Sequence, residues 1–282
     1  MVAVVTQPDR PAHRGQRLTA PPVKQAALAA GLPVLQPARL RDPAWPERLA
    51  GFGAEVAVVV AFGQILPKTV LDVPARGSIN IHASLLPKYR GAAPIQWSII
   101  RGETETGITT FMMDPGMDTG DILLMRSTPI GADETAAELF VRLAPLGAEV
   151  IVETLARLDS LTPRPQDHAA ATLAPRLKKT DGAIDWTRSA RDIVNLARGC
   201  NAWPGATSST PAGSLTIWRA CAIAAPAAAP GTLVRHEGTL AVSSGDGLVL
   251  PRDVQPENRK PMSWDDWLRG ARLSDGARLG AP

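Results

Sequence analysis

Apolar runs alternate with amphipathic segments along the first 160 residues of the chain. Runs rich in apolar and β-branched residues, which are typical of strands, occupy residues 2–5, 32–36, 55–60, 78–82 and 107–113. Helical periodicity marks residues 22–30, 45–52, 94–101 and 135–156, of which the last is the clearest amphipathic helix. The run at 55–60 is so continuously apolar that we expect both of its faces to be covered. This alternation predicts an α/β layer fold with a parallel sheet.

The pattern changes after Leu158, where prolines, alanines and charges replace the regular alternation. Short strands divided by glycine-containing turns are predicted farther on, at residues 215–219, 231–234, 239–243 and 248–254. These strands indicate a small β-barrel or sandwich, whose core we expect to include Trp203, Trp218, Trp264 and Trp267. We therefore expect a first domain at 1–160, a linker at 161–177 and a second domain at 178–282.

Composition narrows the class of protein further. With 282 residues, 45 % hydrophobic and 20 % charged, the chain is neither disordered nor fibrous and suffices for two domains. Cys200 and Cys221 are too few for a disulfide framework or a zinc site. No apolar stretch approaches the roughly 20 residues that span a bilayer, so we expect a cytoplasmic protein without membrane contact. A formal charge of +3, with the basic excess after Arg176, permits an anionic partner.

Two polar side chains end the strand predicted at 78–82. Asn80 and His82 are two residues apart, so they project from the same face of the strand. They also lie at its carboxyl end, where open α/β sheets place their ligands. An amide and an imidazole side by side can both donate hydrogen bonds to a developing oxyanion. The structural alternative is that both side chains merely satisfy loop backbone groups.

A second loop concentrates carboxylates between turn-forming residues. Asp114, Asp118 and Asp121 fall within eight residues, and we expect Asp114 and Asp121 to cap turns. Asp118 is the carboxylate that we expect beside His82. A carboxylate next to an imidazole fixes its tautomer and stabilises its charged form.

Together these segments resemble the folate-dependent formyltransferases. The likeness is carried by NIHASLLP at 80–87, RGAAPI at 90–95 and DTGD at 118–121, and it continues in IDW at 184–186 and NAWP at 201–204. Within the family, the branch that acts on methionyl-tRNA is the most similar. The resemblance implies a Rossmann-like catalytic domain followed by an OB-like β-barrel domain. It implies catalysis by Asn80, His82 and Asp118, with 10-formyltetrahydrofolate as the formyl donor and no metal.

The same resemblance assigns folate contacts. It implies that Ser84, Leu85, Leu86 and Pro87 line the folate site and that Ile65 and Leu66 form part of the pterin wall. For Ile65 and Leu66, plain core packing is the alternative.

A basic loop near the start suggests the acceptor. TQPDRPAHRG, at 6–15, resembles the insertion by which the methionyl-tRNA branch grips the acceptor end of initiator tRNA. The resemblance implies tRNA contact by Arg14, with Arg10 and Arg17 beside it, and initiator methionyl-tRNA as the partner of a monomer. Branches that act on glycinamide ribonucleotide or amino sugars generally lack this loop.

The beginning of the chain departs from the family. Its members open with a strand, a turn and a helix before the strand that corresponds to residues 2–5. We therefore expect the first strand and helix of the Rossmann-like domain to be missing and the native protein to be longer. Genuine loss of this segment with impaired activity is the alternative.

Other functions remain as rivals. One is a folate-dependent formyltransferase that acts on a sugar-nucleotide amine, and another is an inactive truncated homologue that binds RNA. A nicotinamide dehydrogenase is disfavoured because no Gly-x-Gly-x-x-Gly follows a predicted strand.

Overall fold

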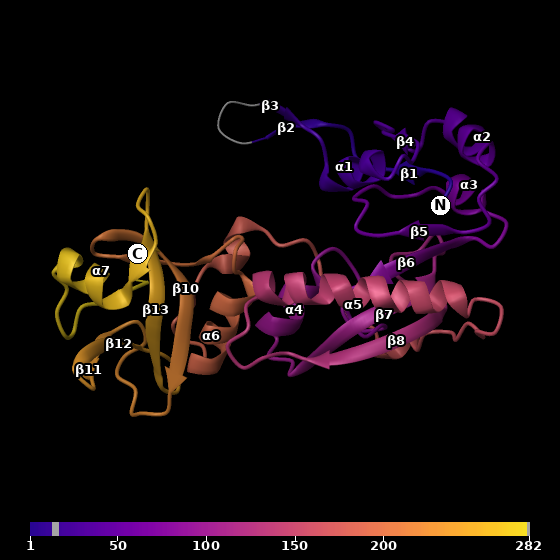
Figure 1. Cartoon of the computed structure of the whole chain (residues 1–282). Coiled ribbons are helices and arrows are strands. Elements are labelled where there is room, and N and C mark those ends of the chain that lie inside the picture. The colour runs from indigo at the N-terminus through magenta and orange to yellow at the C-terminus, as the bar shows by residue number, and fades with distance from the viewer. Residues whose placement is uncertain (13–16, 281–282) are drawn as a thin grey trace. The chain divides into compact units, whose positions relative to one another are not determined.

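A computed structural model of the chain describes residues 1–12 and 17–280 (Figure 1). It consists of two compact units, each assembled from separate stretches of sequence. Unit 1 comprises Met1–His82, Ile108–Met125 and Glu149–Ala170. Unit 2 comprises Ala83–Gly107, Arg126–Ala148 and Ala171–Pro282.

Unit 1 opens with a short parallel pair of strands. Strand β1 (Val4–Val5) pairs with β4 (Val34–Leu35), and α1 (Pro22–Ala29) lies between them in sequence. The N-terminal Pro22 suits the first turn of α1, and Gly31 follows the helix with a φ of 68°. The region predicted as a plain loop contains an antiparallel hairpin, β2 (Arg10–Ala12) with β3 (Arg17–Thr19).

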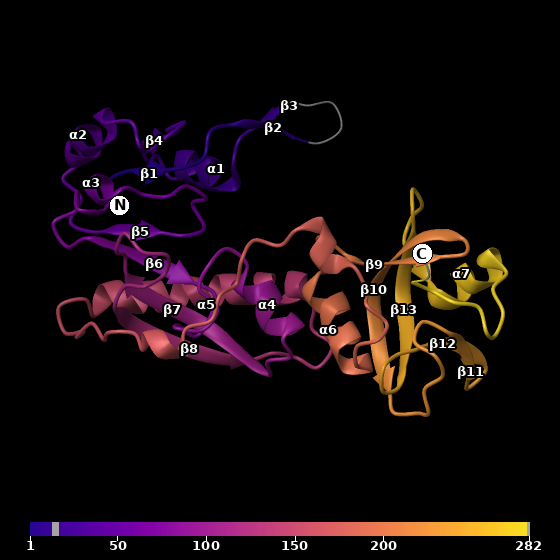
Figure 2. The ribbon, with the colours of Figure 1, turned by 180° about the vertical axis from the view of Figure 1, so that it is seen from behind.

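A second sheet carries the predicted polar strand. Its order is β5 (Ala57–Val59), β6 (Ser78–His82), β7 (Glu105–Met112) and β8 (Ile122–Pro129), seen from behind in Figure 2. The β5–β6 pair is parallel, whereas β6 and β7 are antiparallel, so the expected parallel sheet is instead mixed. Because only residues 113–121 connect β7 to β8, the chain returns there as a hairpin.

Strand β5 is less covered than its sequence predicts. Val58 is 41 % and Val60 is 56 % exposed, so the expectation of burial on both faces is wrong. The reason lies in the strand pairing, because the β1–β4 pair and the β5–β8 sheet are not joined by strand hydrogen bonds in the described ranges. The remaining helices of this region are α2 (Ala44–Ala50) and α3 (Lys68–Leu71).

Helices α4 (Pro94–Ile100) and α6 (Ala190–Gly199) pack together in unit 2. Their close approach depends on Gly199, because a Cβ there would lie 2.5 Å from Ile100 Cγ1. The long helix predicted at 135–156 is α5 (Ala136–Ala156). It begins with a capping box in which Thr135 N donates to Glu138 Oε2 at 2.9 Å and Glu138 N donates to Thr135 Oγ1 at 3.3 Å.

The C-terminal part of unit 2 is an antiparallel sheet. Its strands and final helix are β9 (Ala206–Thr210), β10 (Gly213–Ile223), β11 (Leu233–His236), β12 (Thr239–Ser243), β13 (Leu248–Pro256), β14 (Met262–Ser263) and α7 (Trp264–Ala271). The pairing runs β11-β12-β13-β10-β9, with β14 on β13. Over residues 1–12 and 17–280 this path does not close into a barrel. Strand β10 continues through residues 220–223, beyond the run predicted at 215–219.

Two of the four tryptophans predicted for the core beneath this sheet lie in it, whereas Trp218 and Trp203 do not. Trp264 and Trp267 are buried and stack with ring centroids 4.9 Å apart. Trp218 is half-buried, and its indole donates to Gln255 Oε1 at 3.0 Å. Trp203 is 56 % exposed, so its predicted place in the core is wrong. It lies in the turn between α6 and β9, where no sheet face covers it.

Residues 161–177 are tied down by main-chain hydrogen bonds within each unit. In unit 1, Arg164 N donates to Ile122 O at 2.9 Å. In unit 2, Arg90 N donates to Thr172 O at 2.9 Å, and Ala174 N donates to Arg90 O at 2.7 Å. The short 3₁₀ turn η1 (His168–Ala170) lies within this stretch, and η2 (Lys179–Gly182) follows it.

Candidate active site

Strand β6 presents one apolar and one polar face. Ile79 is fully buried in the core of unit 1 with Leu123 and Ile151, so the alternate residues Asn80 and His82 face the other way. Pairing with β7 fixes their register. The regular strand therefore places an amide and an imidazole side by side at its carboxyl end.

Asp118 lies against His82, as the sequence predicts. His82 Nδ1 is 3.7 Å from Asp118 Oδ2, and the two side chains are only 6 % and 15 % exposed. Asp118 has a φ of 56°, in the left-handed region that few residues other than glycine occupy. A strained backbone that directs a carboxylate toward an imidazole is a common feature of functional loops.

Gln166 supports this loop from a distant part of the sequence. The Gln166 side chain is buried, and its Nε2 donates to the main-chain oxygens of Asp118 at 3.0 Å and Gly120 at 2.7 Å. Gly120 leaves no room for a side chain, since a Cβ there would lie 1.7 Å from Met112 O. Sequence reasoning missed Gln166 because no local pattern connects it to Asp118.

Asp114 holds the other side of the same loop. Its Oδ1 accepts hydrogen bonds from Gly116 N at 3.0 Å and Thr119 Oγ1 at 2.7 Å. This confirms that Asp114 caps the turn, as predicted. The backbone on both sides of Asp118 is thus fixed by buried or half-buried polar contacts.

Asn80 has an unsatisfied polar atom. Its Oδ1 is buried without a hydrogen-bond partner among the described residues. Native proteins pair most buried polar atoms, so such an atom beside a histidine–aspartate pair marks a place where a ligand completes the bonding. An amide, an imidazole and a carboxylate at this spacing can stabilise an oxyanion and move a proton.

The predicted folate residues fall in both units. In unit 2, Ser84 and Leu86 are buried, Leu85 and Pro87 are half-buried, and Ser84 Oγ donates to Lys88 O at 2.6 Å. In unit 1, the predicted residues are Ile65 and Leu66, which lie in the loop after β5.

That loop contains Ile65 and Leu66. Ile65 is 72 % exposed, which excludes the core-packing alternative for it, and Leu66 is half-buried. The loop is fixed by Gln64, whose Nε2 donates to Pro37 O at 3.3 Å, and by a hydrogen bond from Gln7 Nε2 to Phe62 O at 2.7 Å. Ile65 is therefore an apolar side chain presented to solvent on a braced loop.

Two of the three predicted tRNA residues, Arg10 and Arg17, belong to strands β2 and β3. Arg10 is exposed on β2 and donates to Gln7 Oε1 at 2.9 Å, while Arg17 begins β3 opposite Ala12. Arg14 lies outside the described residues.

The root of the hairpin is braced by Asp9. Lys24 Nζ donates to both carboxylate oxygens, at 2.9 and 2.7 Å, and Gln36 Nε2 donates to Oδ1 at 2.7 Å. The hydrogen bonds from Gln36 and Lys24 lower the pKa of Asp9. Hence α1 and the end of β4 both hold the residue from which the hairpin departs.

Metal ligands and membrane-spanning helices can be judged over the described ranges, residues 1–12 and 17–280. No three His, Cys, Asp or Glu side chains there lie close enough to hold a metal ion. No helix within those ranges is long and apolar enough to cross a membrane.

Comparison with known proteins identifies the family. Residues 1–155 match the family model described as formyl transferase, and residues 176–272 match its C-terminal domain. A methionyl-tRNA formyltransferase of Solibacter usitatus (strain Ellin6076) is 52 % identical over 283 residues, covering 99 % of this chain and 91 % of the relative. One from Citrifermentans bemidjiense is 50 % identical over 284 residues, covering 99 % and 89 % respectively.

Solved structures agree at the level of the fold. HypX from Aquifex aeolicus in complex with tetrahydrofolic acid aligns with a TM-score of 0.64 and 16 % identity, covering 97 % of this chain and 48 % of HypX. The sugar 3N-formyl transferase WlaRD aligns with a TM-score of 0.65 and 18 % identity, covering 92 % of this chain and 88 % of WlaRD. The resemblance read from the sequence motifs is thereby confirmed, and the chain belongs to the formyl transferase family.

Proposed function

We propose that the protein transfers the formyl group of 10-formyltetrahydrofolate to the α-amino group of methionyl-initiator tRNA. Relatives with about half of their residues identical over nearly the whole chain bear the name of that enzyme. Those names favour a tRNA acceptor over a sugar-nucleotide amine. The structural observation that carries the proposal is the unpartnered Asn80 oxygen beside the His82–Asp118 pair.

The three side chains have distinct roles in the proposed reaction. The amine nitrogen attacks the formyl carbon, the new C–N bond forms, and the carbonyl electron pair moves to oxygen. Asn80 Nδ2 and His82 donate hydrogen bonds to that oxyanion, while Asn80 Oδ1 accepts one from the attacking amine. Asp118 fixes the tautomer of His82 and accepts the ammonium proton, directly or through water. When the intermediate collapses, the bond from carbon to N10 of the folate breaks, and N10 takes up the proton that the amine released.

The remaining substrate contacts are proposed from the family resemblance. Ser84 to Pro87 line the folate site, and the exposed Ile65 with Leu66 supplies part of the pterin wall. Arg14 contacts the acceptor end of the tRNA, together with Arg10 on β2 and Arg17 on β3. The basic balance after Arg176 adds phosphate contacts of the kind that contribute affinity without sequence specificity.

Finer features of the fold are proposed in the same way. The domains are 1–160 and 178–282 with a linker at 161–177, boundaries close to the family matches at 1–155 and 176–272. The second domain is an OB-like barrel, a class that often binds nucleic acid. The bulge near Arg219 in β10 supports this, since bulges bend strands toward closure.

A further strand fits between β1 and β5 in the Rossmann-like sheet. The parallel pairs β1–β4 and β5–β6 are unjoined in the described part of unit 1, and Val58 and Val60 are exposed there. A strand and helix of the kind that the family carries upstream would pair the open edges and cover this apolar surface. We also propose that the protein acts as a monomer in the cytoplasm, where its charged tRNA substrate is found.

A formylation assay tests the function. Purified protein, both alone and with a family-type strand and helix added upstream, is incubated with 10-formyltetrahydrofolate and methionyl-initiator tRNA. Formylmethionyl-tRNA is the expected product, and a sugar-nucleotide amine should not be formylated. Absence of product from both proteins would instead support an inactive RNA-binding homologue.

A further inference from the structure

Unit 2 contains a cavity away from Asn80, His82 and Asp118 in sequence. Its volume is about 500 Å³, within the range of pockets that bind small molecules. Its walls come from the end of α4, the segment after β8 and one face of α6. The charged and polar side chains that line it include Arg101, Glu103, Arg191, Asp192, Asn195 and Arg198.

Helix α6 supplies one wall through a single stripe. Arg191, Asn195 and Arg198 are separated by four and three residues, so they share one face of the helix. Asn195 and Arg198 are buried, whereas Arg191 is exposed at the rim. The stripe thus leads from a solvent-exposed guanidinium to a buried one.

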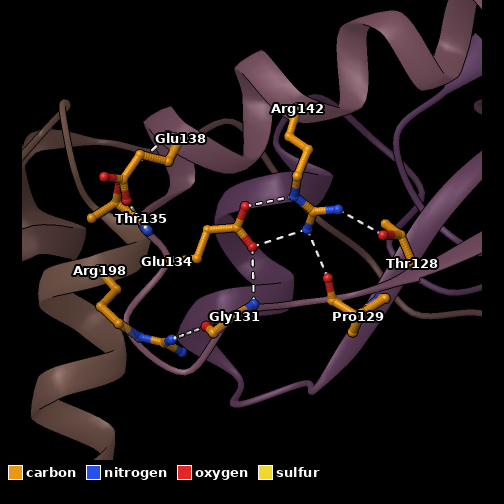
Figure 3. Close-up of polar contacts among 8 residues, drawn as sticks. All are labelled: Thr128, Pro129, Gly131, Glu134, Thr135, Glu138, Arg142 and Arg198. Atoms are coloured by element: carbon orange, nitrogen blue, oxygen red, sulfur yellow. Dashed lines mark hydrogen bonds and ion pairs between the residues drawn. The ribbon is translucent and has the colours of Figure 1, made fainter.

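Arg198 is a buried cation that forms no ion pair within the described residues, although the charges of Asp133 and Glu134 act on it from a distance. It is only 7 % exposed, and Nη1 donates to Gly131 O at 2.9 Å (Figure 3) and also to Ala132 O. Nη2 donates to Asn195 Oδ1 at 3.1 Å, whereas Nε has no partner and no described carboxylate forms an ion pair with Arg198. Burial lowers the pKa of Arg198, and the nearby charge of Arg191 lowers it as well, whereas Asp133 and Glu134 act in the opposite direction. Main-chain carbonyls accept hydrogen bonds from Nη1 but leave the net charge of the group in place.

The other guanidinium groups add to this positive charge. Arg191 has no partner within the described chain, and its charge repels that of Arg198. Arg101 lies over the rings of Tyr89 and Trp97, 5.3 and 5.4 Å from their centroids, and its Nη2 donates to Leu173 O.

The two carboxylates on the wall are engaged elsewhere. Glu103 accepts a hydrogen bond from Tyr89 OH at 2.8 Å and lies 3.4 Å from Lys88 Nζ. Asp192 lies 3.5 Å from Arg188 Nε. Neither of these two carboxylates forms an ion pair with Arg101, Arg191 or Arg198 within the described residues, although Asp133 and Glu134 act on Arg198 from a distance.

Asn195 offers one more donor. Its Oδ1 accepts from Arg198, which leaves the Nδ2 hydrogens for another group. Gly102 makes space beside it, since a Cβ at that position would lie 3.0 Å from Nδ2. Amide and guanidinium donors around a solvent-accessible cavity form a chemistry that suits an anion with several oxygens.

We propose that this cavity is a binding site for a phosphate group, held by Arg101, Arg191 and Asn195 above the buried charge of Arg198. Arginine forks match phosphate geometry through paired hydrogen bonds. The phosphate belongs either to a free nucleotide or to the backbone of an RNA ligand. The site stands independently of formyl transfer, although the RNA source would extend the tRNA surface.

Calorimetric titration with inorganic phosphate and with adenosine 5′-monophosphate tests the site, with chloride held at matched ionic strength. Arg191→Gln is the test variant, because Arg191 is exposed and its loss leaves the buried contacts of Arg198 intact. Arg235→Gln, at an exposed position of β11, is the matched control for charge. Wild type and the control should bind saturably, and Arg191→Gln should weaken binding about tenfold, the effect of losing a charge-assisted hydrogen bond. Circular dichroism verifies that all three proteins are folded.

A second titration distinguishes the sources of the phosphate. If initiator tRNA displaces the nucleotide, and Arg191→Gln lowers the salt slope of tRNA binding by about 1 relative to Arg235→Gln, the phosphate belongs to RNA. If tRNA does not displace a bound nucleotide, the ligand is a free nucleotide. The proposal is overturned if Arg191→Gln and Arg235→Gln bind phosphate, nucleotide and tRNA equally.

Discussion

The side chain of Gln166 holds the main chain of Asp118. Its Nε2 donates to Asp118 O at 3.0 Å and to Gly120 O at 2.7 Å, although more than forty residues separate them. Because the same loop places the Asp118 carboxylate 3.7 Å from His82, Gln166 acts on the histidine through the backbone. It is a positioning residue rather than one that contacts substrate.

Gln166→Ala should therefore lower kcat more than it changes KM. Two carbonyls lose their partner, which removes about 1 kcal/mol of stability for each hydrogen bond, and a displaced carboxylate reduces turnover about tenfold. Steady-state kinetics with thermal unfolding checks both effects. Gln166→Glu is the companion variant, since its carboxylate cannot donate to the carbonyls when ionised. Wild-type turnover in a destabilised Gln166→Ala protein would show that Gln166 is structural only.

His82→Ala should reduce turnover by a factor of about 10² to 10⁴, because oxyanion stabilisation and proton transfer both depend on the imidazole. Folate binding should change little. Single-turnover formylation and equilibrium folate binding separate the two effects, and His168→Ala, at an exposed position in η1, is the control. Near-normal turnover in His82→Ala would remove His82 from the mechanism.

Arg14→Ala should raise KM for methionyl-tRNA and leave the KM for the folate donor unchanged. The reason is that a lost guanidinium removes a contact to one macromolecular substrate alone. Kinetics with each substrate varied in turn measures this, and Arg252→Ala, exposed on β13, is the matched charge control. An effect confined to folate affinity would refute the assignment of the hairpin to tRNA.

Glu138 should make stability depend on pH in the acid range. Hydrogen bonds from the Thr135 backbone and hydroxyl and from Arg219 lower the pKa of Glu138 to about 2, from its usual 4.5. Since the folded pKa lies below the unfolded one, the contribution to stability is present above about 4.5 and is lost as pH falls toward 2.

Thermal unfolding of wild type and Glu138→Gln between pH 7 and pH 3 measures this contribution. The difference in Tm should be constant near neutrality and shrink below about pH 4.5. Glu237→Gln, at an exposed turn, provides the control. A difference that persists undiminished to pH 3 would mean that the carboxylate charge of Glu138 contributes nothing.

Gly199→Ala should destabilise the protein by about 1–3 kcal/mol, as overpacking does in other cores. The added Cβ would lie 2.5 Å from Ile100 Cγ1 and 2.9 Å from Gln96 O, so α4 and α6 must separate. Denaturant unfolding measures the change. Gly270→Ala, in α7 with open space around it, should be neutral or stabilising because alanine favours the helix. Equal effects from both substitutions would contradict this account of the α4–α6 contact.

The polar strand and its loop could be predicted from sequence because their signals are local. The alternation at 78–82 places Asn80 and His82 on one face, and β12 coincides with the run predicted at 239–243. Gln166 could not be found in this way, since its contacts depend on how distant segments meet.

Other elements were missed although their sequence signals are readable. Helices α6 and α7 follow Ser189 and Ser263, each of which accepts a hydrogen bond from the backbone of an aspartate three residues later. For strand β5 the sequence signal was misleading. A continuous apolar run predicts a strand but does not show which of its two faces other elements cover. The prediction that Trp203 lies in the core was wrong for a related reason. It was based on the residue type alone, whereas Trp203 lies in an exposed turn.

The hydrogen bonds of Asp9 have a consequence for how the β2–β3 hairpin can vary in sequence. Lys24 and Gln36 hold the root of the β2–β3 hairpin from α1 and the end of β4. These contacts use the side chain of Asp9, so they do not depend on which residues stand in β2 and β3. We therefore expect substitutions in β2 and β3 to change what the hairpin contacts while its attachment to unit 1 stays in place.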